Sequence, residues 1–381
     1  MSFIVVNPSP PLEPKPVTPS DSLISLTFQP HPGETLPEFS RRFARELRGS
    51  PGTPLHLQAF GDCRAGETIT AALQTCFGRV DWPVTWVAGA ACDSQPVAGL
   101  QVHLFTGHVD RLQLGRQVMG SVFTDGDARQ CLIGGILPAP DLTRPQQTAR
   151  AIEQLQALLV QAGFELTDVI RTWFFLDQIL KWYPDFNRAR NGIYSGLKFR
   201  TGSLPASTGV GAANPAGAAL ALAAWAHRPL APSAYANEIA SPLQCPAPAY
   251  GSAFSRAMET STNQGRRLFL SGTASIAPAG ETLWVGDVRQ QVRLTMEVVE
   301  AILHSRNFTW ADLTRATAYF RHPADVGVLA DWLGTRQLSS LPVVRTQCDV
   351  CRDDLLFELE AEAETCCQPA NSLVKSIPSL A

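Results

Sequence analysis

The chain has 381 residues, of which 45% are hydrophobic and 17% are charged, and its formal net charge is −3 at pH 7. This length and composition exclude a disordered protein and allow two or three buried cores. The small negative charge without a basic cluster argues against nucleic acid as a partner, so the sequence indicates a globular protein of enzyme size.

The sequence carries no sign of membrane insertion, export or metal binding. No apolar run has membrane-spanning length, and the segment Met1 to Pro8 lacks the basic start of a signal peptide. We therefore expect a cytoplasmic protein without a membrane partner. The nine cysteines are irregularly spaced, and only Cys348-Asp-Val-Cys351 has the Cys-x-x-Cys form. Since a zinc site needs further ligands and disulfides need an oxidising compartment, we expect neither, and no cofactor.

Proline-rich stretches divide the chain. Between them the length is sufficient for three units. The expected segments are a flexible Pro-rich N-terminus (1–21), a degenerate unit (22–112), a clear unit (113–230), a Pro-rich linker (231–248), a C-terminal catalytic unit (249–366) and a tail (367–381).

The two clear units have the same predicted order of strand, helix, strand, helix, strand. In the degenerate first unit, residues 66–79 are expected to form a helix and residues 84–88 a strand. In the second, apolar residues at three- and four-residue spacing predict an amphipathic helix, followed by a strand at 171–176 and a short polar helix at 185–194. In the third, a similar amphipathic helix precedes a strand at 314–320.

An internal repeat supports this division. Four unlike residue types recur in the second and third units with one constant displacement of 144 residues, for example 315 minus 171. The matching pairs are Gln147 and Gln291, Phe164 and Phe308, Asp168 and Asp312, and Arg171 and Arg315. Each copy ends in Leu-Pro followed by a last strand, and only the later copy has an arginine, Arg345, in that strand.

The end of the third unit has the period-2 pattern of a half-buried strand. Its apolar face and its acidic face alternate: Leu355, Phe357 and Leu359 against Glu358, Glu360 and Glu362. The acidic residues therefore leave the core on which the strand is built. Periodicity cannot decide whether Glu358 faces water or a cleft; for an isolated strand we expect solvent, since a charge on the polar face needs no function.

Six blocks of the sequence carry a resemblance to known families: Arg171 to Asp177, Phe186 to Tyr194, Ser207 to Gly211, Tyr250 to Ala257, Ser271 to Ser275 and Cys351 to Glu358. The chain resembles the imine-deaminase superfamily of RidA and YjgF, whose members are trimers of a six-stranded sheet packed by two helices. A closer resemblance is to the chorismatases, in which this fold is repeated within one chain. The resemblance implies an α+β fold of tandem RidA-like (chorismate-mutase-like) units, with mixed sheets packed by helices, arranged as an intramolecular pseudo-trimer and therefore a monomer.

The resemblance also implies a substrate, chorismate, and a site in the C-terminal unit with Glu358 as the catalytic acid. Cys351 lies seven residues before Glu358. Chorismatases with cysteine in that place make 3-hydroxybenzoate, so we expect Cys351 to be catalytic. A buried structural cysteine is the alternative.

The remaining site residues are expected to bind substrate. Arg345 and Arg171 could hold carboxylates bidentately, Tyr194 could donate a hydrogen bond, and Gly209 and Gly272 are expected to line the site. The alternatives are an edge-strand or inter-unit ion pair for Arg171 and packing at a unit interface for Tyr194.

The expected reaction begins when Glu358 protonates the terminal methylene of the enolpyruvyl ether, for which its pKa must be raised by a dry pocket. Attack by the neighbouring ring hydroxyl then gives pyruvate and 3-hydroxybenzoate, with a share of 4-hydroxybenzoate left open. One alternative is a chorismate hydrolase that forms pyruvate and a dihydroxycyclohexadiene carboxylate. The alternative from another class is a RidA-like imine deaminase or small-ligand-binding protein.

Overall fold

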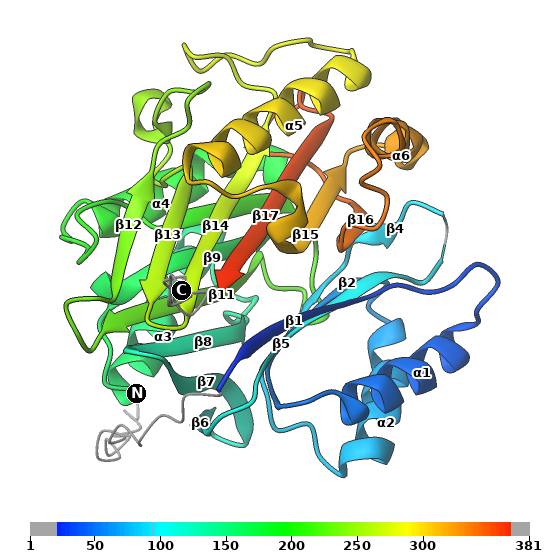
Figure 1. Ribbon diagram of the computed structural model, residues 1–381, viewed down its shortest axis with the longest axis vertical. Helices are drawn as coiled ribbons and strands as arrows, with labels where there is room; N and C mark the ends of the chain where they lie inside the picture. The colour runs from blue at the N-terminus through cyan, green and yellow to red at the C-terminus, as the bar shows by residue number, and fades with distance from the viewer. Residues whose placement is uncertain (1–20, 94, 367–381) are drawn as a thin grey trace, which may run out of the picture.

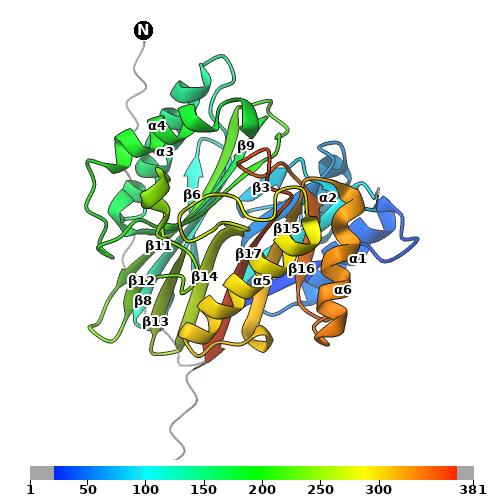
Figure 2. The ribbon, with the colours of Figure 1, turned by 90° about the horizontal axis from the view of Figure 1, so that it is seen from above.

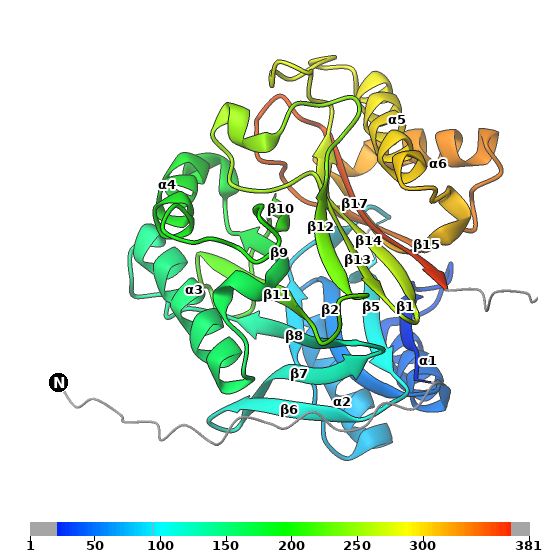
Figure 3. The same ribbon diagram turned by 60° about the vertical axis from the view of Figure 1, so that its left-hand side comes forward.

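The computed structural model describes residues 21–93 and 95–366. Three β-sheets lie around a common axis, and each sheet carries two helices on its outer face (Figures 1 and 3). The predicted tail and nearly all of the predicted N-terminal segment lie outside the described residues. The membrane expectation has one structural test: no described helix combines the length and apolar character that a crossing requires.

The first sheet is the smallest of the three and has four strands. Its strand order is β1 (Leu23–Phe28), β5 (Val97–Phe105), β2 (Thr53–Gly61) and β3 (Val84–Val87), and its helices are α1 (Leu36–Gly49) and α2 (Ala65–Phe77). A capping box formed by Thr35 and Glu38 begins α1, because each side chain satisfies a backbone N–H that the first turn leaves free.

The second sheet has six strands. Its order is β10 (Ala206–Gly211), β9 (Val169–Leu176), β11 (Leu220–Pro229), β8 (Ala128–Ile136), β7 (Gln117–Asp125) and β6 (Val109–Leu114), and its helices are α3 (Arg144–Gln161) and α4 (Tyr183–Tyr194). Strand β6 spans the predicted boundary between residues 112 and 113. The apolar stripe of α3, with Ile152, Leu155 and Leu159, is buried against this sheet.

The third sheet has seven strands. Its order is β12 (Tyr235–Ile239), β13 (Ala257–Thr262), β14 (Gly265–Ala274), β17 (Phe357–Cys366), β15 (Leu313–Phe320), β16 (Val343–Gln347) and β4 (Ala90–Ala91), and its helices are α5 (Val288–Ser305) and α6 (Val326–Thr335). Strand β12 lies within the stretch expected as a linker and pairs with β13. Strand β4 comes from the first unit's part of the chain and pairs with β16, which ties the two units together.

The three sheets are versions of one unit. The order β16-β15-β17-β14-β13-β12 in the third sheet repeats the order β10-β9-β11-β8-β7-β6 in the second, and β3-β2-β5-β1 repeats its first four places. Among residues 21–93 and 95–366, the first unit has no counterpart of the two strands with which the second and third units begin. The predicted α+β fold of tandem units forming a pseudo-trimer in one chain is confirmed, whereas the monomeric state stays a prediction.

An aromatic cluster marks the axis of the pseudo-trimer. The ring of Phe60 from β2 lies 6.1 Å from the rings of Phe175 (β9) and Tyr319 (β15), measured between centroids. All three are buried in the core shared by the sheets. The helices lie on the outside, with α3 and α4 on one side of the molecule and α5 and α6 on another (Figure 2). The inner faces of the sheets therefore pack on one another rather than facing water.

This packing answers the question that periodicity left open for the acidic face of β17. Glu358, Glu360 and Glu362 do not face solvent: they are 4%, 2% and 2% exposed. The polar face of β17 points toward the axis, where the other two units cover it. The helix and strand expected at 66–79 and 84–88 are confirmed as α2 and β3, and those at 185–194 and 314–320 as α4 and β15, with ends shifted by a few residues.

Candidate active site

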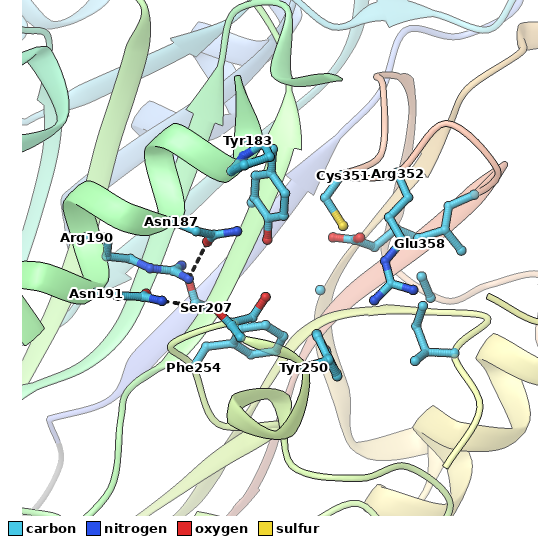
Figure 4. A pocket seen from close by; sticks show the side chains of 18 of the residues that line it. Tyr183, Asn187, Arg190, Asn191, Ser207, Tyr250, Phe254, Cys351, Arg352 and Glu358 are labelled. Carbon is cyan, nitrogen blue, oxygen red and sulfur yellow. Dashed lines mark hydrogen bonds between the residues drawn. The ribbon is translucent and has the colours of Figure 1, made fainter. Parts of the chain in front are cut away.

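A cavity of about 440 Å³ lies between the second and third units (Figure 4). The second unit contributes α4 and β10, and the third contributes the segment before β13, the end of β14 and the segment leading into β17. Its labelled lining residues are Tyr183, Asn187, Arg190, Asn191, Ser207, Tyr250, Phe254, Cys351, Arg352 and Glu358. A cavity of this size with a few converging polar groups is typical of small-molecule sites.

Glu358 is the acidic residue of the cavity lining. It lies on β17, where it pairs with Tyr319 on one side and Ala274 on the other. Burial, with the charge of Glu360 as the next cause, raises the pKa of Glu358 to about 8, although Arg171 and Arg256 oppose the shift. The carboxyl group is therefore mostly protonated at neutral pH and can act as a general acid.

Gly272 makes room for this carboxyl group. The pairing of β14 with β17 shifts register between Leu270 and Thr273, so Gly272 lies in a β-bulge. A Cβ at Gly272 would come within 2.0 Å of Glu358 Oε1, which excludes any other residue without movement of the acid. Gly209 lines the opposite wall on β10, where a Cβ would meet only Tyr183 Cε2, at 4.0 Å.

Cys351 lies in the same cavity, and its sulfur points toward the carboxyl group of Glu358 (Figure 4). Burial, followed by the Glu358 charge, raises the pKa of this thiol to about 12. The group is therefore a thiol rather than a thiolate at neutral pH, and it offers a weak hydrogen-bond donor instead of a strong nucleophile. The structure thus brings together Glu358, Cys351, Gly209 and Gly272.

The cavity is lined by four arginines but by one carboxyl group, that of Glu358. Arg190 on α4 is 2% exposed; its Nη2 donates to Asn187 Oδ1 at 2.8 Å, while its Nε has no partner within the described chain. Arg256 is 3% exposed; its Nε donates to the carbonyl of Cys245, and its Nη2 is unpaired among the residues described. Buried guanidinium groups with free donors favour an anion carrying planar oxygens.

Arg345 belongs to a different junction. It pairs with Ala318, whereas Gly209 pairs with Phe174, and residues 318 and 174 differ by the repeat displacement of 144. Gly209 therefore holds, beside this cavity, the place that Arg345 holds between the third and first units. Arg345 is not among the residues that line the cavity.

The two other predicted substrate ligands also lie outside the cavity lining. Arg171 is 1% exposed and its Nη2 donates to Glu360 of the third unit at 2.7 Å, the inter-unit ion pair kept as an alternative. Tyr194 is 4% exposed and packs edge-on against Phe199, with centroids 5.3 Å apart, in the core of the second unit. These geometries give neither residue direct access to a bound ligand.

Sequence reasoning missed the basic and aromatic walls of the cavity, above all Arg190, Arg256, Tyr183 and Tyr250. A signal was present for α4, because its polar residues exceed what a packing helix requires. For Arg256 the sequence has no periodic pattern or motif spacing that indicates a site, since this residue lies in an irregular segment before β13. Within the described ranges, no group of three or more His, Cys, Asp or Glu residues could hold a metal ion.

Comparison with known proteins finds a curated relative and solved structures of similar fold. No family model matches the chain. A 3-hydroxybenzoate synthase of Streptomyces hygroscopicus is 27% identical over 242 residues, which are 56% of this chain and 68% of that protein. A chorismatase crystal structure superposes with a TM-score of 0.63 at 18% identity, covering 90% of this chain and 98% of the other. A putative endoribonuclease L-PSP from Entamoeba histolytica, 17% identical, aligns over its whole length with 34% of this chain at a TM-score of 0.30.

Proposed function

Because the chain belongs to the chorismatase and 3-hydroxybenzoate synthase family, we propose that it cleaves the enolpyruvyl ether of chorismate to pyruvate and 3-hydroxybenzoate. The observation that carries this proposal is Glu358, a buried carboxyl group with a pKa of about 8 in a cavity lined by four arginines. An acid that keeps its proton at neutral pH beside cationic side chains suits a dianionic substrate that must be protonated.

In this proposal Arg190 and Arg256 hold the two carboxylates of chorismate from opposite walls, one in each unit. Each guanidinium keeps at least one free donor for a ligand. The Tyr183 hydroxyl points into the cavity (Figure 4), and burial raises its pKa, so it is a neutral hydrogen-bond donor for a ring oxygen. The charge of the two guanidinium groups and their planar arrangement of N–H donors together orient the chorismate ring.

The chemical step begins with transfer of the Glu358 proton to the terminal methylene carbon, which leaves an oxocarbenium ion. The neighbouring ring hydroxyl attacks the ring carbon that carries the ether, the bond between that carbon and the ether oxygen breaks, and pyruvate leaves. The hydroxyl proton is released as the epoxide forms and returns to this oxygen when the epoxide opens. The epoxide-like ring intermediate then opens and loses a ring proton as it becomes aromatic. This proton balances the one that Glu358 gave up, so no water is consumed. The Cys351 thiol lies where it can steer or relay that proton.

The first experiment incubates the purified protein with chorismate and measures pyruvate enzymatically and aromatic products by chromatography. We expect pyruvate and 3-hydroxybenzoate in equal amounts. A parallel incubation with an imino acid, followed by ammonia release, tests the imine-deaminase alternative. Ammonia release without pyruvate release would overturn the proposal.

A second experiment tests product choice with Cys351→Ala. We expect pyruvate release to continue, because Glu358 is unchanged, while the ring product shifts toward the dihydroxycyclohexadiene carboxylate. In heavy-oxygen water, the 3-hydroxybenzoate of the wild-type protein should carry no label in its ring hydroxyl. A wild-type protein that forms only the diene diol would instead be a chorismate hydrolase, and an unchanged product from Cys351→Ala would make the cysteine structural.

A further inference from the structure

Thr208 on β10 joins the wall of the cavity to a buried arginine behind it. Its Oγ1 accepts a hydrogen bond from the backbone N–H of Gly272 at 3.1 Å and another from Arg171 Nη2 at 2.6 Å. Gly272 N–H lies in the bulge of β14, and Thr208 replaces the strand partner that the bulge removes. A second bond, from Ser207 N to Ser271 Oγ at 2.8 Å, fixes the same bulge to β10. The second unit therefore holds the surface against which Glu358 lies.

Arg171 connects this surface to the carboxylates of β17. Its Nη2 lies 2.7 Å from Glu360 Oε2, and both side chains are almost fully buried. Farther along β17, Arg315 lies 2.6 Å from Glu362, which also contacts His103 at 2.9 Å. Two arginines thus balance two carboxylates. Glu358 forms no ion pair with any described residue, so it is the member of the row that is left without a cation in contact.

The junction between the first and second units contains the same arrangement without an acid. Thr85 Oγ1 accepts from Gly135 N–H at 2.9 Å and lies 2.8 Å from His56 Nε2. His56 corresponds to Arg171 by strand pairing, since it faces His103 as Arg171 faces Trp225. Ala221, which pairs with Phe175, stands in the place of Glu358. The Thr to Gly hydrogen bond is therefore common to these two junctions, whereas the buried Arg171 to Glu360 ion pair belongs to the junction with the acid.

We propose that Glu360, Arg171 and Thr208 are positioning residues for Glu358: they fix the bulge behind its carboxyl group and place a balanced ion pair, rather than a lone cation, beside it. This inference rests on the proposed role of Glu358 as the acid. It gives Arg171 a function through Glu360 and Thr208 rather than through contact with substrate.

Several titratable or charged groups act on Glu358 from every side. They are Glu360 on the same strand, Arg171 on β9, Tyr319 on β15, Tyr183 on α4, Arg256 before β13, and Cys348 and Cys351 in the segment before β17. Glu360 raises the pKa of Glu358 and Arg171 lowers it. Loss of Glu360 alone leaves the cation unopposed, so the pKa of Glu358 should fall.

The first test is Glu360→Gln, read as the pH at which Glu358 ionises. We expect the midpoint to move down by about one pH unit or more, since alternate residues of a strand lie about 7 Å apart and the interior screens weakly. Carbon-13 NMR of labelled glutamate, assigned with Glu358→Gln, measures this without turnover. The double variant Arg171→Met with Glu360→Gln removes both charges and should return the midpoint most of the way toward wild type. Glu360→Gln leaves the buried Arg171 unpaired and could prevent folding. In that case the double variant, in which both side chains stay buried but neither is charged, is the one to be measured.

The second test compares Thr208→Val with Thr85→Val, which break the same bond at the two junctions. Both should lower the melting temperature by similar amounts, but only Thr208→Val should lower kcat, by about tenfold, with little change in KM. Equal kcat values for Thr208→Val and Thr85→Val would overturn the inference. So would a Glu360→Gln variant in which neither the Glu358 midpoint nor the turnover changes. If the wild type releases no pyruvate while the NMR midpoint still shifts, the proposed function fails and the electrostatic part of the inference stands.

Discussion

The junction between the second and third units is hollow beside Glu358. The junction between the third and first units, called the packed junction below, is filled at the equivalent place, beside Gly99. Glu358 pairs with Tyr319 in the first case, and Gly99 pairs with Phe60 in the second, where Phe60 and Tyr319 belong to the same aromatic cluster. A Cβ at Gly99 would lie 2.5 Å from Val344 Cγ2, so the side chain of Val344 on β16 occupies the space. At this place Val344 fills the space beside Gly99, whereas a cavity opens beside Glu358.

The arginine of the last strand lies at the packed junction, not at the hollow one that contains Glu358. The packed junction has Arg345 on β16, and the hollow one has Gly209 in the equivalent place on β10. The arginine and the acid of this repeated unit therefore lie at different junctions. The cavity obtains its positive charge from α4 and from the segment before β13 instead.

The largest expected effect follows from removing the acid of the hollow junction. Glu358→Gln keeps the shape of the side chain but has no transferable proton, so pyruvate release should fall by at least about a hundredfold. Glu364→Gln, farther along β17 and partly exposed beside Arg267, is the control and should keep most activity. Comparable losses from both variants would mean that the acid is misassigned.

The two glycines of the cavity give the next comparison. In Gly272→Ala the new Cβ would collide with Glu358 Oε1 and displace it, so kcat should fall by about ten- to a hundredfold. Gly209→Ala has open space at its Cβ and should change kcat by less than about threefold. Steady-state kinetics with chorismate measures both, and equal kcat values would contradict the geometry.

A smaller effect, on KM for chorismate, should distinguish Arg256 at the hollow junction from Arg345 at the packed one. Arg256→Lys loses the planar fork and should raise KM for chorismate by about tenfold. Arg345→Lys, which changes a residue outside the cavity, should leave KM within about twofold of the wild-type value. The reverse order of the two KM values would place the substrate at the packed junction.

The smallest effect concerns stability against pH. The folded-state pKa of Glu358 is about 8, above its ordinary value of 4.5, so folding favours the protonated form. Wild-type stability should therefore decline relative to Glu358→Gln as pH rises between these two values, and the difference should become constant above pH 8. Melting temperatures at pH 5 and pH 9 test this: Glu358→Gln should gain several degrees over wild type only at pH 9.

The sequence allowed the repeat and the strand of Glu358 to be predicted, but not the surroundings of that strand. The displacement of 144 residues correctly places Arg171 and Arg315 on equivalent strands, β9 and β15. Period-2 alternation shows which face of β17 is polar, yet it cannot distinguish water from a neighbouring unit, so the burial of all three carboxylates did not follow from it. Arg256 was missed because contacts between units leave no local pattern. Arg190 was missed because the excess of polar residues on α4 does not show which of them faces a cavity.

The fusion of three units into one chain removes a constraint that a ring of identical subunits would impose. In such a ring every substitution appears at all junctions at once, so glycine and arginine could not both occupy the place of Gly209 and Arg345. A single polypeptide can keep Gly99, Ala221 and Glu358 at its three equivalent positions. Symmetry breaking of this kind fixes the stoichiometry: titration calorimetry with a substrate analogue should find one molecule bound per chain.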